Sequence, residues 1–300
     1  MHPMNSQKIA VITDSGTNVP PAFAKEHDIR IVPLLINYTD GTYRSEIDIT
    51  GQQVIDRLSS EVPTTSLPSP SSIREVLEQA KADGYEKAVI VTISSGLSAT
   101  NQTAHLVASQ MEDFPVEVVD TLSIGIAAGL TVMDASLMIE AGVPFEELPG
   151  RLNALANQTL VLFSVDDLTY LRKGGRISEA TYRLGSALNI KPIFDCDDEG
   201  HYRTVKKCRG RDKALKSTIS LIAERAKEYE QVVLAAAVAV HDAANDAAVH
   251  ALQEKVTNAV GLISTSISPD LLVHTGPSLL GMAVQPAIPE MAAAAAALEG

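Results

Sequence analysis

The sequence predicts two α/β domains, the first built on a mainly parallel sheet flanked by helices. In the first half of the chain, short and continuously apolar runs alternate with amphipathic helical patterns, which is typical of parallel sheets covered on both faces. The 300 residues are 45% hydrophobic, which is enough for one large core or two modest ones. Aromatic residues make up only 4% and Trp is absent, so Ala, Val, Leu and Ile must form most of the core.

The first predicted domain covers residues 8–157. A proline at position 33 indicates an edge or a bulge in its second strand. The strand that ends at residue 93 leads into a polar loop and then a helix, which is where ligands of such sheets usually bind. Strands are expected at 9–13, 31–36, 87–93 and 116–119, and helices at 51–59, 71–82, 99–111 and 124–140.

The second predicted domain covers residues 158–288 and leaves a cleft against the first. It contains a helical stretch and a Gly-Gly loop at 173–176, and residues 189–194 and 201–207 are expected to form a hairpin. Residues 289–300 are a low-complexity tail to which we assign no function. Further strands are expected at 159–165, 231–240 and 261–266, and helices at 211–228 and 243–256.

Charge and cysteine content restrict the environment and the partners of the chain. A net charge of -13 argues against a general nucleic-acid-binding face. A hairpin turn centred near Glu199 would place Cys196 opposite residue 203 and away from Cys208, so we expect no disulfide and a reducing, cytoplasmic location. The start of the sequence, MHPMNSQK, has no apolar signal core. The longest apolar stretch, 232–240, is too short to span a bilayer, so at most a transient membrane contact is expected.

Two hydroxyl-rich segments are candidates for a binding site. In the segment 64–70 and just after it, Ser69 or Ser71 is suited to cap the following helix, whereas Thr65 and Ser66 precede the cap and are free to face a ligand. The segment 94–100 places Ser94 and Ser95 at a strand end before a helix start, where unpaired N–H groups favour an anion. A simple cap by Ser98 explains that second segment equally well.

Other polar segments give weaker indications. Ser98 could act as a hydrolase nucleophile, but Gly96-Leu-Ser98-Ala-Thr100 lacks the second glycine of a nucleophile elbow. Arg172 and Arg176 flank a Gly-Gly pair, as in a solvated loop, a phosphate clamp or a docking surface. His274 precedes a Gly-Pro turn and could donate to a carboxylate. Neither metal-ligand spacing nor a dinucleotide fingerprint occurs, so we expect no metal and no cofactor, and binding is favoured over catalysis.

Seven short motifs, taken together and in this order, resemble the DegV family of bacterial lipid-binding proteins. They span residues 9–286, nearly the whole chain, and their order makes the resemblance specific. The motifs are TDS at 13–15, TSLPS at 65–69, SSGLS at 94–98, DT at 120–121, KGGRIS at 173–178, IKPI at 190–193 and HTGP at 274–277.

The resemblance implies a fatty acid buried between and below two α/β domains. It also implies that a separate ATP-dependent fatty acid kinase subunit phosphorylates the bound carboxylate for phospholipid synthesis. Thr65, Ser95 and His274 are then expected to hold that carboxylate, with Ser66 and Ser94 beside them.

The same resemblance makes Arg172 and Arg176 candidates for the surface that faces the kinase or the phosphate. Ser278 departs from the family pattern, which usually has glycine after Gly-Pro, and a side chain there would narrow the site or shift His274. The alternatives are a serine hydrolase using Ser98 and a stand-alone lipid sensor without a kinase partner.

Overall fold

The first sheet is formed by the N-terminal half of the chain, and its four strands are all parallel. The computed structural model describes residues 4–187 and 189–298. The strand order is β2-β1-β6-β7, and each neighbouring pair is parallel. The predicted parallel arrangement is therefore confirmed. The strands are β1 (Ile9–Asp14), β2 (Arg30–Val32), β6 (Lys87–Thr92) and β7 (Val116–Asp120).

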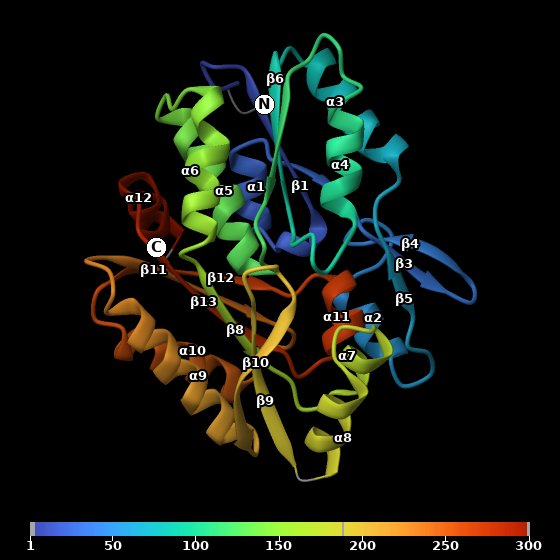
Figure 1. Ribbon diagram of the computed structural model, residues 1–300, viewed down its shortest axis with the longest axis vertical. Helices are drawn as coiled ribbons and strands as arrows, with labels where there is room; N and C mark the ends of the chain where they lie inside the picture. Colours follow the sequence, from blue (N-terminus) through green and yellow to red (C-terminus); the bar gives the residue numbers. More distant parts are fainter. Residues whose placement is uncertain (1–3, 188, 299–300) are drawn as a thin grey trace.

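Helices cover both faces of this sheet (Figure 1). Ile9 and Val11 of β1 belong to the core that contains the first group of helices. Ala10 and Ile12 point the other way, into a separate core with the second group. This alternation is what a strand buried on both faces requires. The first group is α1 (Pro21–Glu26), α5 (Ile126–Glu140) and α6 (Leu148–Ala156), and the second is α3 (Pro70–Ala82) and α4 (Thr100–Ala108); short 3-10 helices are η1 (Ser15–Thr17) and η2 (Phe145–Glu147).

The strand predicted at 31–36 is in fact two strands in different sheets. Pro33 has no N–H to donate, and the chain leaves the parallel sheet at this point. The part after it is β3 (Leu35–Tyr38), the centre of an antiparallel sheet with the order β4-β3-β5. The strands β4 (Gly41–Arg44) and β5 (Thr64–Ser66), which have only four and three residues, were not predicted. Helix α2 (Gly51–Arg57) follows β4 and is capped by Thr50.

The second sheet has six strands in the order β10-β9-β8-β13-β11-β12 and is mixed. The predicted hairpin is confirmed, because β9 and β10 pair antiparallel. Strand β13, which was not predicted, runs antiparallel between β8 and β11 and is buried over most of its length. The strands are β8 (Leu160–Ser164), β9 (Ile190–Cys196), β10 (Tyr202–Arg209), β11 (Val232–Val238), β12 (Ala259–Ser266) and β13 (Leu280–Pro286).

The six-stranded sheet faces helices α9 (Arg211–Ala226) and α10 (Ala243–Lys255) on one side and the first half of the molecule on the other (Figure 1). Leu234 of β11 packs in the core with α9 and α10. Ala235 and Ala237 of the same strand lie instead in the core that also contains β1 and α5. The two halves thus share one continuous core at the inner face of this sheet.

Two helices of the second half extend onto the first. Helix α11 (Pro269–Thr275) packs against α2, β3 and β5, and α12 (Pro289–Leu298) packs against α5 and β12. The segment assigned as a tail therefore contains a packed helix, with Met291 fully buried. The predicted boundary between 157 and 158 remains a prediction. Two further helices, α7 (Thr169–Lys173) and α8 (Glu179–Ala187), connect β8 to β9.

Both cysteines are free thiols, as predicted. Cys196 lies opposite Tyr202 in the hairpin, one residue from the expected partner, and Cys208 lies opposite Lys191. In the described part of the chain, none of the helices is both long enough and apolar enough to cross a membrane.

Candidate ligand-binding cavity

A cavity of about 320 Å³ lies where the two halves of the molecule meet. This volume is at the lower end of the range for small-molecule sites. Apart from half-buried Tyr202, the lining side chains from the six-stranded sheet and α5 are apolar and buried, whereas those from β5 and the 94–98 loop are polar or half-buried. The cavity therefore has an apolar body and a polar rim. The lining residues are Leu34, Thr65–Leu67, Ile93, Leu97–Ala99, Ile124–Ile126, Val161, Phe163, Arg176, Tyr202, Ala237, Ile267, Asp270, Leu271, His274, Thr275, Leu279 and Gly281.

Thr65 and His274 form the first polar pair of the site. Thr65 is held in β5, which pairs with β3, and its hydroxyl lies 2.7 Å from Nε2 of His274 in the last turn of α11. Nδ1 of His274 is buried and has no hydrogen-bond partner among the described residues. Burial, reinforced by the positive charge of Arg176, lowers the pKa of His274 to about 3. The imidazole is therefore neutral at physiological pH, and one of its nitrogens carries a proton that can be donated.

Gly174 fixes the position of the imidazole. A Cβ atom at this position would overlap Nδ1 of His274, and it would lie 2.9 Å from Cε1. Gly174, the first residue of the Gly-Gly pair in the charged loop, thus has a packing role at the site. The same overlap explains why position 174, between Lys173 and Arg176, must be glycine.

In Gly174→Ala, we expect the imidazole to move and the Thr65–His274 hydrogen bond to break. Overpacking of this kind costs roughly 1–3 kcal/mol in the free energy of unfolding. Denaturant titration would measure the loss, and a crystal structure would show the shifted ring. The matched control is Gly150→Ala on α6, where an added Cβ meets nothing within 4 Å. Equal stabilities of the two variants would contradict this role of Gly174.

Arg176 lies at the polar rim and connects two loops. It donates to the carbonyl oxygen of Gly174 and, at 3.0 Å, to that of Leu97. Among the described lining residues, it is the only Arg or Lys side chain. A guanidinium carries five N–H donors, so these two bonds leave donors for a ligand. The site thus places a positive charge, a neutral imidazole and a hydroxyl close together.

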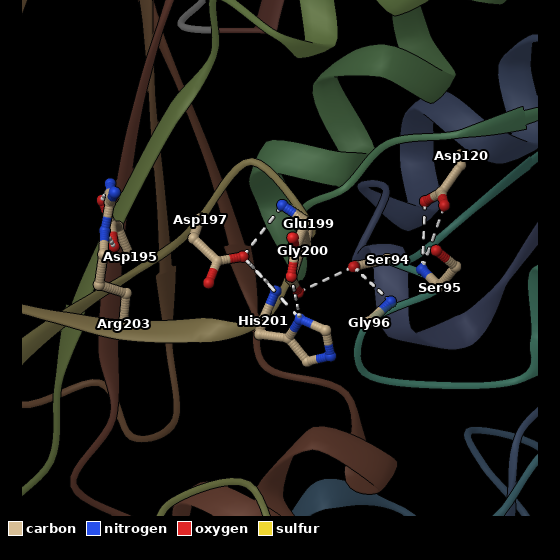
Figure 2. Close-up of polar contacts among 10 residues, drawn as sticks. All are labelled: Ser94, Ser95, Gly96, Asp120, Asp195, Asp197, Glu199, Gly200, His201 and Arg203. Carbon is tan, nitrogen blue, oxygen red and sulfur yellow. Dashed lines mark hydrogen bonds and ion pairs between the residues drawn. The ribbon is translucent and has the colours of Figure 1, made fainter.

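Ser94 joins the two halves of the molecule and does not line the cavity. Its hydroxyl donates at 2.8 Å to the carbonyl oxygen of Gly200, in the turn between β9 and β10, and accepts from the Gly96 amide at 3.0 Å. Figure 2 shows this side chain directed at the turn, with Asp120 on the opposite side of the loop. A Cβ at Gly96 would lie 2.6 Å from the carbonyl oxygen of Glu199, so this contact requires glycine.

Ser95 also lies outside the lining residues. Its backbone amide donates to both carboxylate oxygens of Asp120, at 3.2 and 3.3 Å (Figure 2). The neighbouring amides of Leu97 and Ser98 donate to the carbonyl oxygen of Ser94. The loop therefore already binds an anion, namely a carboxylate of the protein itself. These amides are not available to a ligand in the way the anion-site interpretation required.

Ser98 does line the cavity, but its contacts do not form a nucleophile–base pair. Its hydroxyl lies 2.8 Å from that of Thr100 and accepts from the Thr100 amide at 3.3 Å. The imidazole that could act as a base is instead paired with Thr65. A base in such a site is normally oriented by a third group, and Nδ1 of His274 has no such partner within residues 4–187 and 189–298. No observation favours the hydrolase.

Two buried carboxyl groups, Asp270 on α11 and Asp14 at the end of β1, were not predicted as site residues. Asp270 accepts hydrogen bonds from Ser15 at 2.6 Å and from Ser268 at 2.9 Å. Asp14 at the end of β1 accepts from the amides of Gly16 and Ile93, both at 2.9 Å. Burial raises the pKa of both groups, that of Asp14 to about 7. Asp270 and His274 are one helical turn apart, so the hydrogen bonds of Asp270 hold the helix that carries the imidazole.

Of the remaining predicted residues, Arg172 and Ser278 do not line the cavity, whereas Ser66 does. Arg172 donates to Glu179 at 3.3 Å, and its guanidinium lies 4.2 Å from the centre of the Tyr182 ring. Ser278 neither narrows the site nor contacts His274, because its hydroxyl accepts from the Asp166 amide at 2.9 Å. Within the described ranges, no cluster of His, Cys, Asp and Glu could hold a metal ion.

Fold and cavity together define an α/β protein that encloses an apolar cavity with one polar end. The family model described as "Uncharacterised protein, DegV family" matches residues 8–287. A DegV domain-containing protein of Clostridium perfringens is 35% identical over 291 residues, covering 93% of this chain and 99% of that protein. The chain therefore belongs to the DegV family.

Solved structures of the family are closely similar to this one. A DegV family protein of Thermus thermophilus, described as binding fatty acid, has a TM-score of 0.86 at 27% identity, covering 93% of this chain and 99% of that one. DegV of Bacillus subtilis, described as a fatty acid binding protein, has a TM-score of 0.84 at 26% identity, covering 95% and 100% of the two chains.

Proposed function

We propose that this protein binds a long-chain fatty acid in the cavity and presents its carboxylate to a separate, ATP-dependent kinase subunit. The observation that carries the proposal is the division of the cavity into a buried apolar body and a half-buried polar rim with a cation. An amphiphile with one anionic end matches both parts. The two solved relatives described as fatty acid binding support the same ligand class.

The carboxylate is assigned to Thr65, His274 and Arg176, with Ser66 beside them. A buried carboxylate without donors costs several kcal/mol, and a guanidinium, a hydroxyl and an imidazole N–H can supply them. Ser95 is assigned to the same end of the site, where its amide fixes the loop through Asp120. Ser94 is assigned the role of fixing that loop to the β9–β10 turn.

The acyl chain supplies most of the binding free energy. Each buried CH₂ contributes roughly 0.8 kcal/mol, so a chain of about fifteen carbons offers on the order of 12 kcal/mol before entropic costs. That contribution requires a closed apolar surface. Buried side chains of α5 and of the six-stranded sheet, such as Ile126, Val161 and Phe163, provide it.

The kinase subunit would transfer the γ-phosphoryl group of ATP to a carboxylate oxygen, giving an acyl phosphate and ADP. Half-buried Thr65, Leu97 and Arg176 border the polar end, so a partner that docks there can reach the carboxylate. Arg172 is assigned to the partner-facing surface. The proposal implies a cytoplasmic carrier that performs no reaction alone, and two free thiols are consistent with a reducing compartment.

The test is mass spectrometry of the protein purified from a bacterial host and extracted under denaturing conditions. We expect one long-chain fatty acid per protein molecule. Thr65→Ala should retain less, by roughly tenfold in affinity for palmitate, because a hydrogen bond to a charged group is lost. Protein that is repeatedly empty and binds neither palmitate nor oleate would refute the ligand.

The role of the carrier is tested separately from the ligand. Loaded protein should consume ATP only when a fatty acid kinase subunit is added, and Arg172→Ala should slow that reaction while retaining the lipid. Turnover of ATP by the loaded chain alone would refute the carrier role. Failure to recover any kinase subunit from the native host would instead favour a lipid sensor.

A further inference from the structure

Gly281 is a buried glycine in a central strand, and neither usual reason for a glycine applies there. Glycine weakens a strand interior because it has no side chain to pack and loses much conformational freedom. The backbone of Gly281 is not in the left-handed region, and a Cβ there would meet only the carbonyl oxygen of Ala237, at 3.9 Å. At Gly96 or Gly174, by contrast, a Cβ would overlap its neighbours.

The space beside Gly281 opens into the cavity. Gly281 on β13 pairs with Phe163 on β8 and with Ala237 on β11. All three residues line the cavity, so they form one row across its floor. Residues paired across a sheet point to the same face, which places the missing side chain between an aromatic ring and a methyl group.

Aromatic side chains close one end of this row. The Phe163 and Phe194 rings are stacked with their centres 5.4 Å apart, and Tyr202 meets Phe163 edge-on at 5.0 Å. At the next position on the same face, Ala283 is fully buried and does not line the cavity. The open space is therefore local to Gly281, and it is not a general consequence of small residues in β13.

We propose that the acyl chain crosses the six-stranded sheet over Gly281, and that the absent side chain sets the longest chain the cavity accepts. This proposal rests on the proposed fatty-acid ligand. A glycine that costs strand stability is explained if a ligand occupies the space that a side chain would fill. Filling that space from the protein side should exclude the end of a long chain while leaving the polar rim intact.

The test compares Gly281→Ala and Gly281→Val with Gly150→Ala and Gly150→Val, which add the same groups on α6 where a Cβ meets nothing within 4 Å. Each delipidated protein is incubated with an equimolar mixture of saturated fatty acids of 12 to 18 carbons, and the bound lipids are quantified by mass spectrometry. One methylene in an apolar pocket changes selectivity by roughly tenfold or more. We expect Gly281→Val to shift the bound ratio towards shorter chains by at least about that factor, with total occupancy unchanged.

A second measurement separates ligand space from a structural role. Gly281→Ala, without ligand, should melt no lower than the original protein, because its methyl group enters open space in a strand. If Gly281→Val does not fold, Gly281→Ala tests the proposal instead. We then expect a smaller shift of the bound ratio towards shorter chains. An unchanged chain-length ratio would overturn the proposal while the fatty-acid function stands. Binding of no fatty acid by any of the proteins, the original included, would refute the function itself.

Discussion

Replacing Arg176 with Met is expected to lower the affinity for palmitate by roughly 100-fold, because a charge-assisted interaction with the carboxylate is lost. Arg176 is the only Arg or Lys side chain among the described residues around the cavity, and Met preserves much of the length of its apolar stem. The matched control is Arg172→Met, which removes the same charge from a side chain that does not line the cavity.

Arg176 also donates to the carbonyl oxygen of Leu97, so its removal could loosen the rim without any role for its charge. Hexadecanol separates the two effects, since it has the same tail and no carboxylate. A loosened rim should weaken both ligands equally, whereas a lost ion pair should weaken palmitate alone. Isothermal titration of both ligands against both variants gives the answer. Equal losses for the acid and the alcohol would show that Arg176 acts only as a structural link.

Local patterns in the sequence predict most of the fold because they report burial directly. Continuous apolar runs indicate the parallel strands, and the β9–β10 hairpin follows from two strands that flank the turn Asp197-Asp-Glu-Gly200. The second sheet was predicted less well. Strand β13 follows the Gly-Pro turn after His274, which drew attention as a binding motif, and β5 is only three residues long and depends on pairing with β3. Such strands are defined by their partners.

The candidate site could be predicted only in part, because its geometry depends on contacts between distant segments. Hydroxyl content indicated Thr65 and Ser66, and both line the cavity. The same reasoning selected Ser94, whose hydroxyl instead bonds to Gly200, more than a hundred residues away. Arg176 was predicted on the surface that faces the kinase or the phosphate, and no local pattern reveals that it bonds to the carbonyl oxygen of Leu97 in the 94–98 segment.

The buried Asp134 leads to the second large expected effect, which concerns stability. Asp134 lies on α5, and one of its oxygens accepts a hydrogen bond of 2.7 Å from Gln285 on β13. Its other oxygen is buried without a partner in the described part of the chain. Burial, reinforced by the negative charge of Glu290, raises the pKa of Asp134 from 3.8 to about 8. The folded protein therefore holds this carboxyl in its neutral form at pH 7.

The sign of the pH dependence follows from this raised pKa. Between about pH 4 and pH 8, the native state keeps a proton that the unfolded state has lost, so Asp134 lowers the free energy of unfolding as the pH rises. Near pH 7, the resulting destabilisation is on the order of a few kcal/mol. Asn has nearly the same shape, keeps an acceptor for Gln285 and cannot ionise.

We therefore expect Asp134→Asn to stabilise the delipidated protein by a few kcal/mol at pH 7–8 and to have little effect at pH 4. Urea titrations of both proteins across this range measure the difference. Because Asp14 and His274 titrate identically in both proteins, their contributions cancel in that difference. The control is Asp113→Asn, which makes the same substitution at an exposed position before β7. A difference that stays constant with pH would show that Asp134 is ionised in the folded protein, and that the core accommodates its charge.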